Sequence, residues 1–150
     1  MTNQKLRQTY YGAVNFLTQK FNLKPFSSGN GENTVAYAKW LRELYPDSKL
    51  WLLWDGASYH RYAEMRDYLM EINANLPEEA WPVTCILFAS NAPEQNPVED
   101  IWLKGKNWLR RNFAFNKTFA DVKKCFFDYL QDGVFPSTKY DWYRPSPQII

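Results

Sequence analysis

The chain has 150 residues, of which 45% are hydrophobic and 18% aromatic, a composition that supports a packed core and excludes a disordered chain. Its formal net charge of +2 is too small to indicate a nucleic-acid partner by itself. No apolar run approaches the roughly 20 residues that cross a bilayer, and the polar start Met1–Lys5 lacks the apolar segment of a signal peptide. We therefore expect a cytoplasmic protein without a membrane partner.

The first half of the chain alternates β-rich and helical segments. Residues 9–15 and 20–25 predict two strands joined by a short hairpin-like connection. Apolar residues recur at helical spacing over residues 33–45, with Asn33 as the expected N-terminal cap. Residues 49–54 form an almost continuous apolar run, which predicts a strand buried on both faces of a parallel or mixed sheet.

The second half continues this alternation and ends in a segment without period. A helix is expected over residues 62–72, a strand over 83–88, a helix from Asn96 to about Asn112, and a last helix over 119–131. Pro97 suits the first helical position, where its missing amide proton costs nothing. The end of the chain is rich in Pro and aromatic residues, which predicts an extended tail. Cys85 and Cys125 lack the spacing of zinc ligands, so we expect reduced core thiols.

An acidic residue, Asp55, directly follows the apolar strand, at the edge where open α/β sheets place their ligands. Asp55-Gly56 is also a favoured hairpin turn, but the following residues run into a helical pattern rather than into a second strand. His60 is the only histidine. A single histidine is usually structural, although its pKa would let it act as an acid or a base near neutrality.

A second acid, Glu99, is expected in the first turn of the helix that Asn96 opens. As the third helical residue, Glu99 can reach back to the Asn96 amide and complete a capping box, an alternative to a functional role that stays open. Asp100 is the other possible ligand, but on a helix it points about 100° away from Glu99. Carboxylates at a strand end and a helix start suggest a divalent-metal site.

Positive charge follows this helix start. Residues 101–119 contain no acid and five basic residues, Lys104, Lys106, Arg110, Arg111 and Lys117. Such charge beside a metal site favours a phosphodiester substrate, because lysine and arginine displace counterions from the backbone. The alternative is a solvated helix face near a C-terminus, where cations suit the helix dipole. The candidate DNA contacts are Lys104, Lys106, Arg110 and Arg111.

The strand ending at Asp55 with His60 after it, and the later Asn96-Pro97-x-Glu99-x-x-Trp102 pattern, resemble the catalytic domain of the mariner-superfamily insertion-sequence transposases. The resemblance runs from about Tyr10 to Arg111. Gly56 departs from it, since the family usually has Asn there, and the interval between the two acids is somewhat longer than usual.

The resemblance implies a ribonuclease H-like fold, an α/β architecture with a mixed sheet flanked by helices. That family carries a third carboxylate, an Asp on the first and central strand, and this chain does not contain it, because residues 9–15 resemble the second strand. We therefore expect residues 1–150 to be a partial DDE catalytic domain that lacks its first central strand. Its core would span about residues 9–131, and residues 132–150 would form the tail.

The resemblance also implies a function: metal-dependent phosphodiester cleavage and strand transfer in DNA transposition by the full-length parent enzyme. Two Mg²⁺ ions, for which Mn²⁺ can substitute, would be held by carboxylates that include Asp55 and Glu99, with His60 as an active-site neighbour. DNA, both element ends and target, is the implied partner; a homo-oligomer is compatible with it, and an N-terminal transposase segment is missing from this chain.

This chain alone is expected to be inactive as an endonuclease, because the first catalytic Asp is absent. The alternative function is a catalytically inactive remnant or split-frame product that acts at most as a DNA- or partner-binding module. A ribonuclease H-like nuclease outside transposition fits the fold but explains the Asn-Pro-x-Glu-x-x-Trp pattern less well.

Overall fold

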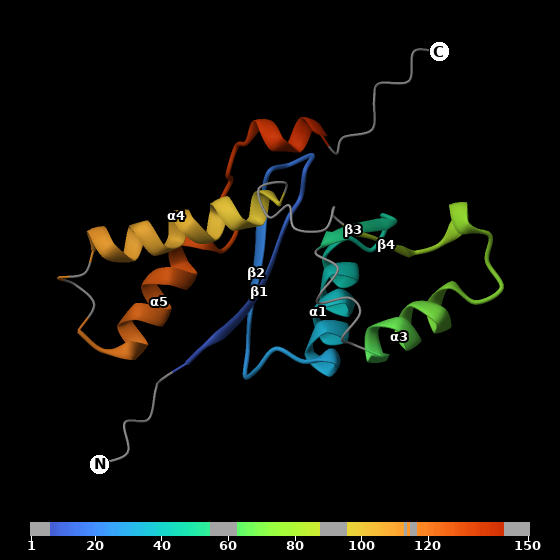
Figure 1. Ribbon diagram of the computed structural model, residues 1–150, viewed down its shortest axis with the longest axis horizontal. Helices are drawn as coiled ribbons and strands as arrows, with labels where there is room; N and C mark the ends of the chain where they lie inside the picture. Colours follow the sequence, from blue (N-terminus) through green and yellow to red (C-terminus); the bar gives the residue numbers. More distant parts are fainter. Residues whose placement is uncertain (1–6, 55–62, 88–95, 113, 115–116, 143–150) are drawn as a thin grey trace. The chain divides into compact units, whose positions relative to one another are not determined.

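The structure is a computed structural model, and it describes residues 7–54, 63–87, 96–112, 114 and 117–142. The chain divides into two compact units: unit 1 comprises Met1–Pro25 and Pro97–Ile150, and unit 2 comprises Phe26–Asn96. Figure 1 shows the elements, which are in chain order β1 (Thr9–Val14), β2 (Phe21–Phe26), α1 (Gly31–Leu44), β3 (Leu50–Trp54), α3 (Ala63–Asn73), η1 (Glu78–Ala80), β4 (Val83–Leu87), α4 (Pro97–Arg111), α5 (Phe119–Leu130) and η4 (Thr138–Trp142).

In unit 1, β1 and β2 pair as a two-stranded sheet, which confirms the predicted hairpin. The turn is built by Asn15, whose side-chain oxygen accepts hydrogen bonds from the amides of Leu17 (2.9 Å) and Thr18 (3.2 Å). Gln19 takes a φ of 64°, in the left-handed region that a tight turn requires. Local side-chain bonds of this kind satisfy turn amides that have no strand partner.

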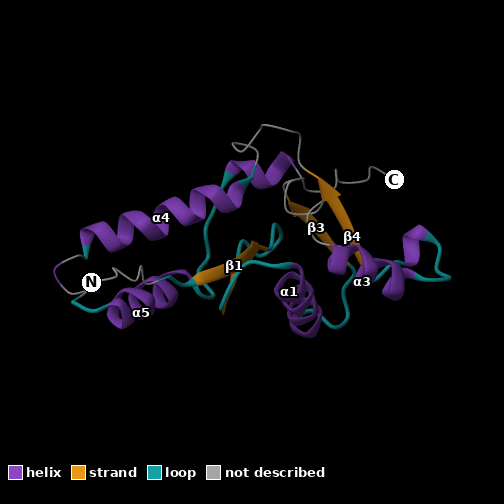
Figure 2. Cartoon of the chain, turned by 60° about the horizontal axis from the view of Figure 1, so that its bottom comes forward, coloured by secondary structure: helices purple, strands orange, loops and turns teal. Residues whose placement is uncertain are grey.

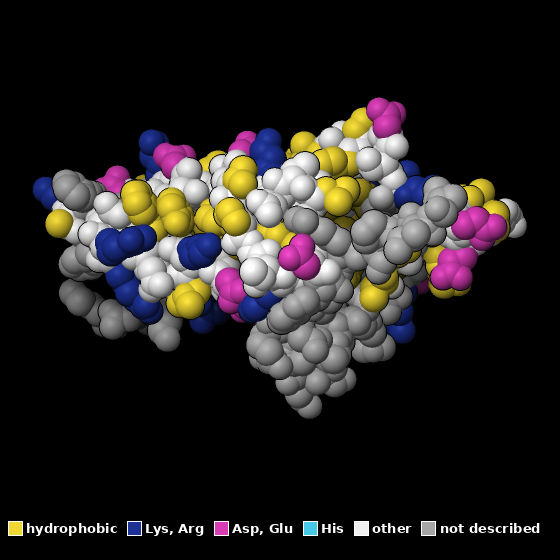
Figure 3. Space-filling model, turned by 90° about the horizontal axis from the view of Figure 1, so that it is seen from above, with side chains coloured by type: hydrophobic (Ala, Val, Ile, Leu, Met, Phe, Trp, Pro, Cys, Tyr) yellow, Lys and Arg dark blue, Asp and Glu magenta, His cyan; other side chains and the backbone are white. Residues whose placement is uncertain are grey.

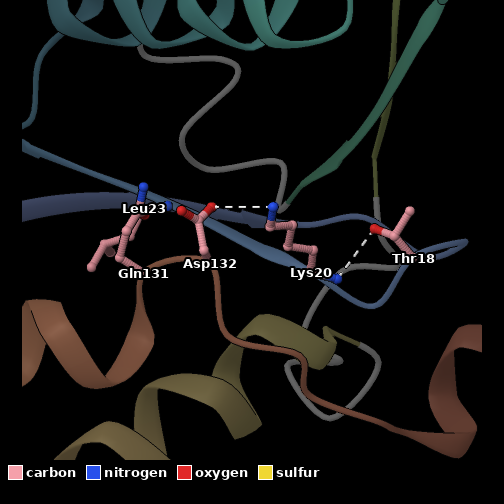
Figure 4. A network of polar contacts seen from close by, with 5 residues as sticks. All are labelled: Thr18, Lys20, Leu23, Gln131 and Asp132. Atoms are coloured by element: carbon pink, nitrogen blue, oxygen red, sulfur yellow. Dashed lines mark hydrogen bonds and ion pairs between the residues drawn. The ribbon is translucent and has the colours of Figure 1, made fainter.

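The segment that follows α5 covers the edge of β2 that faces away from β1. Phe21 N donates to Gly133 O (2.9 Å), and Asp132 N donates to Phe21 O (3.1 Å). The amide of Leu23 donates to the side-chain oxygen of Gln131 (2.9 Å), and Figure 4 shows Gln131 and Asp132 beside the strand. The end of unit 1 therefore closes an edge that would otherwise offer unpaired backbone groups to other molecules.

Helices α4 and α5 pack against each other, and Figures 1 and 2 show α5 turning back along α4. Gly105 lies buried in α4 without ending it. A Cβ at Gly105 would lie 2.7 Å from the Phe126 ring and 3.0 Å from Leu130 Cδ1. The glycine thus lets α5 approach α4 closely, at the expense of helix propensity.

The core of unit 1 joins the hairpin, both helices and the chain end. Its buried residues are Phe21, Leu23, Ile101, Leu130 and Phe135. Trp102 packs between the Phe21 ring, at a centroid distance of 5.2 Å, and the Phe126 ring, at 6.1 Å. Trp102 is therefore a packing residue, and its contacts stabilise the packing of α4 against the hairpin.

The predicted extended tail is wrong for residues 138–142, which form the 3₁₀ helix η4. Tyr140 is fully buried, its ring stacks on Phe16 at 5.5 Å, and its hydroxyl donates to the carbonyl of Phe135. A helix of five residues is too short to show a period in the sequence, which explains the error. Residues 143–150 lie outside the described residues.

In unit 2, β3 and β4 run parallel, with Leu50 opposite Val83 and Trp54 opposite Leu87. One face of this sheet packs against α1 and α3 through a core cluster that includes Leu50, Leu52, Trp54, Val83, Cys85, Ala38, Met65 and Leu69. The prediction that residues 49–54 are buried on both faces is wrong at Trp51, whose side chain is 67% exposed. Side chains alternate along a strand, so Trp51 belongs to the other face.

The cap of α1 differs from the prediction by one helical turn. Asn30 is the N-cap, and its side-chain oxygen accepts from the Asn33 amide at 2.8 Å. Asn33 lies inside the helix, where its side chain donates to the carbonyl of Ser28 at 2.8 Å. Both asparagines suit a cap by residue type. The helix begins at Gly31, so Asn30 occupies the cap position and Asn33 lies within the first turn.

The mixed α/β class that the sequence predicts is confirmed. The described strands form two sheets of two strands each, and the ribonuclease H-like arrangement stays a prediction. None of the described helices combines the length and the apolar character that a membrane span needs.

Candidate functional site

Charge divides unevenly between the two units. Unit 1 contains 13 Lys and Arg against 6 Asp and Glu, a formal net charge of +7, whereas unit 2 contains 5 against 10, a net charge of −5. The net charge of +2 for the whole chain hides this division. A polyanion is attracted to a surface like that of unit 1 and repelled by one like that of unit 2.

Helix α4 carries the most distinct cluster of this charge. Four of its exposed side chains line one open depression of about 400 Å³: Lys104, Asn107, Arg110 and Arg111. Residues three, four and seven positions apart share a face of an α-helix, which brings Lys104, Asn107 and Arg111 together. Figure 3 shows basic side chains among hydrophobic ones on the surface of unit 1. We call this cluster the α4 basic site.

Three contacts hold the long side chains of the α4 basic site in place. Arg110 Nη1 donates to Asn107 Oδ1 at 3.0 Å. Lys104 Nζ lies 5.7 Å from the centroid of the Phe135 ring, and Arg111 Cζ lies 5.9 Å from the centroid of the Trp108 ring. Cation–π contacts at exposed sites contribute about 0.5–1 kcal/mol and leave the positive charge in place for a ligand.

Four acids of α4, α5 and the segment that follows are engaged with other groups. Three form ion pairs, Asp100 with Lys139 (2.7 Å), Asp128 with Lys124 (3.2 Å) and Asp132 with Lys20 (3.6 Å), and Asp121 closes a capping box with Thr118. Among the residues that the structure describes, no carboxylate forms a salt bridge with Lys104, Arg110 or Arg111. The charge of the α4 basic site is therefore not neutralised by neighbouring acids of the described chain.

A row of aromatic rings adjoins these cations. Trp108 and Tyr129 stack with their centroids 4.7 Å apart and their planes 3° apart, and Tyr129 meets Phe135 edge-on at 6.0 Å. Lys104 lies over one end of this row and Arg111 over the other. Cationic grooves with aromatic side chains are typical of surfaces that bind nucleic acid.

The remaining predicted DNA contact, Lys106, is exposed on α4 but does not line the depression. It lies two residues from Lys104, which is about 200° around the helix. Sequence reasoning missed Asn107, although its spacing of three residues from both Lys104 and Arg110 is visible. It also missed Tyr129, because nothing in the sequence places α5 beside Trp108.

The predicted metal ligands are only partly described. Glu99 is exposed in the first turn of α4, whereas Asp55 and His60 lie outside the described residues. The Asp100 carboxylate is held by Lys139, which supports Glu99 as the available acid of this turn. Within the described ranges, no three His, Cys, Asp or Glu side chains are grouped as ligands of a metal ion would be. The Mg²⁺ site thus stays a prediction.

Comparison with known proteins gives no match: no family model fits the chain, and no curated protein or solved structure has significant similarity to it.

Proposed function

We propose that the chain is the C-terminal part of a DDE transposase catalytic domain, and that unit 1 binds DNA through the α4 basic site. One observation carries the DNA binding: Lys104, Arg110 and Arg111 converge on one open depression and have no salt-bridge partner among the described carboxylates. Each phosphate that such a side chain contacts releases a counterion, which favours binding. The net charge of +7 in unit 1 adds a long-range attraction.

The order of the elements supports the transposase part of the proposal. A hairpin, a helix and two parallel strands precede α4, as in a ribonuclease H-like fold after its first strand. Strand β3 ends at Trp54, directly before Asp55, and α4 begins at Pro97, two residues before Glu99. These are the strand-end and helix-start positions at which the resemblance requires acids.

In the full-length parent, Asp55 and Glu99 would hold Mg²⁺, which would supply an activated water or hydroxyl for attack on a phosphodiester. The residues of this chain contribute the rest: Lys104, Arg110 and Arg111 bind and orient the backbone of the DNA, and Lys139 neutralises Asp100 beside Glu99.

A second function, DNA binding without catalysis, is favoured by the positions of the other acids. Only Glu32, Glu43 and Asp47 precede Asp55. Glu32 and Glu43 lie on α1, and Asp47 lies in the turn after it, so none is on a strand. The bridging carboxylate of a two-metal site therefore has no candidate here, and we expect the chain alone neither to cleave nor to join DNA in Mg²⁺ or Mn²⁺. Metal-dependent nicking that is lost on Asp55→Asn would show that another group replaces it.

The DNA-binding proposal is tested by fluorescence anisotropy of a labelled DNA with the whole chain, at salt concentrations between about 50 and 200 mM. Lys104→Ala with Arg111→Ala should weaken binding at least about tenfold and reduce the slope of log K against log salt by about 0.9 for each phosphate that is no longer neutralised. The matched control is Lys20→Ala with Lys124→Ala, which removes the same charge from unit 1 at ion-paired positions.

Equal weakening in the two double variants would show that only the net charge of unit 1 matters. Binding that does not change with salt would contradict any role for the phosphates.

A further inference from the structure

Two cations of the α4 basic site, Lys104 and Arg111, lie over the two ends of one row of aromatic rings. Arg111 lies over Trp108, Trp108 stacks on Tyr129, Tyr129 meets Phe135, and Lys104 lies over Phe135. Trp108 and Tyr129 are half-buried, while Phe135 is 7% exposed. The site therefore offers a flat surface beside its positive charges, the Arg111 guanidinium that lies over the Trp108 indole.

A flat surface of this kind can stack on a base only where a face of that base is accessible. In a duplex, both faces of each base are stacked on neighbouring bases, so a protein reaches phosphates and base edges. In a single strand the faces of the bases are accessible, and they stack on aromatic rings and on arginine guanidinium planes. Such stacking strengthens binding by about 5- to 150-fold per base.

The charge of the site also suits a single strand better than a duplex. Three cations line the depression, while Lys106 lies on another side of α4. The depression, about 400 Å³, lies within the range of roughly 300–1,000 Å³ of clefts that enclose small ligands, so it has room for one unit of a strand. A duplex needs a longer basic surface that follows its backbone.

We infer that the α4 basic site binds single-stranded DNA in preference to duplex DNA, with an unpaired base stacked at Arg111 and Trp108 and the adjoining phosphates held by Lys104 and Arg110. The inference rests on the proposed DNA binding and goes beyond it by naming the form of the strand.

The test compares one labelled strand alone, the same strand annealed to its complement, and a single-stranded RNA of the same sequence. Anisotropy titrations with the whole chain should give single-stranded DNA at least about a tenfold advantage over the duplex near physiological salt. Heparin, a polyanion without bases, competes for charge alone and should displace the duplex more readily than the single strand.

A pair of conservative variants separates stacking from charge. Arg111→Lys keeps the positive charge but removes the planar group that lies over Trp108, so the ratio of single-strand to duplex affinity should fall at least about threefold. Arg110→Lys makes the same chemical change in the same depression, at a side chain that is held by Asn107 rather than by a ring, and that ratio should stay unchanged. Circular dichroism checks that both variants keep their fold.

The outcomes distinguish the inference from the proposal beneath it. Duplex binding as tight as single-strand binding, or equal changes of the ratio in the two variants, would overturn the single-strand preference and leave DNA binding standing. Tighter binding of RNA than of DNA would overturn the assignment to DNA. An absence of salt-dependent binding to any nucleic acid would overturn both.

Discussion

At Gly12, β1 passes so close to aromatic side chains that no larger residue fits without a shift. A Cβ at this position would lie 2.2 Å from Phe21 Cζ and 2.9 Å from the Trp102 ring. Phe21 is fully buried in the core of unit 1 and has little space to move. The Trp102–Phe21 contact therefore fixes a glycine in a strand, where glycine is otherwise unfavourable.

We predict that Gly12→Ala lowers the free energy of unfolding by about 1–3 kcal/mol, the usual effect of overpacking a core. Urea denaturation followed by circular dichroism measures it. Gly29→Ala is the control, because Gly29 lies in an exposed loop. Equal denaturation midpoints for the two variants would mean that the strand has more room at Gly12 than the structure shows.

Burial also sets the chemistry of a thiol in unit 2. Both cysteines are free. Burial raises the pKa of Cys85 to about 12, whereas the pKa of a cysteine in an unfolded chain is about 8.5. Below the unfolded pKa the thiol is protonated in both states, so its contribution to stability is constant. Above it the unfolded chain alone loses the proton, so this contribution is lost as the pH rises toward the folded pKa.

We therefore expect the difference in free energy of unfolding between the wild-type chain and Cys85→Ala to be constant up to about pH 8 and to shrink from about pH 9 upward. Taking the difference between the two chains cancels the titration of tyrosines and lysines that both share. Denaturation curves over this pH range measure it, and a difference that grows with pH would contradict the burial of this thiol.

Among the elements, those with strong local signals could be predicted and those decided by distant contacts could not. The start of α4 at Pro97 and the β1–β2 hairpin follow from proline, capping and turn chemistry near each site. The choice of Asn30 over Asn33 as cap, and the outward face of β3 at Trp51, depend on the chain around them.

The candidate site also combines residues that the sequence reveals with contacts that it does not. The run of basic residues predicted Lys104, Arg110 and Arg111, because charge and helical spacing are visible in the sequence. The contacts of Trp108 with Tyr129 and of Asp100 with Lys139 join segments more than twenty residues apart, and composition does not encode which such segments meet. The first contact extends the aromatic row beside the cations, and the second neutralises Asp100.

Helix η4 is the clearest element of this second kind, and one side chain anchors it. The Tyr140 hydroxyl donates to the carbonyl of Phe135 in the core of unit 1. Burial, and then the negative charge of Asp100, raise the pKa of Tyr140, so it stays protonated and able to donate. The residue thus ties η4 to the segment that covers the edge of β2.

We predict that Tyr140→Phe lowers the free energy of unfolding by about 1–3 kcal/mol, because it leaves a buried carbonyl without its donor. Tyr129→Phe is the matched control: it removes a hydroxyl from a half-buried ring and keeps the stack on Trp108. Thermal denaturation of both variants measures the effect. Destabilisation of the same size in the control would assign it to the aromatic substitution rather than to the hydrogen bond.

At the scale of the whole molecule, the division of charge and the edges of the sheets distinguish the two units. Unit 1 carries a net charge of +7 and unit 2 a net charge of −5, so the attraction for a polyanion is concentrated in one unit. The described strands form two sheets of two strands, and two-stranded sheets are marginal by themselves. Unit 1 covers one edge of its hairpin with the Gln131–Phe135 segment, whereas β3, within the ranges that the structure describes, is paired on one edge, with β4.

Hydrogen exchange read residue by residue on the whole chain tests that difference. Leu50 N donates to Pro82 O at 2.9 Å, and the register of β3 with β4 then directs the Leu52 amide to β4 and the amides of Trp51 and Leu53 to the other edge. We expect slow exchange at Leu52 and fast exchange at Trp51 and Leu53. The amides of Phe21 and Leu23, which the chain end covers, serve as protected controls in β2. An edge of β3 without a strand partner in the described chain, with an exposed Trp51 beside it, also predicts poor solubility. Uniform slow exchange across β3 in a monomer would mean that another strand pairs there, and that the first central strand, which the sequence led us to expect to be missing, has been replaced.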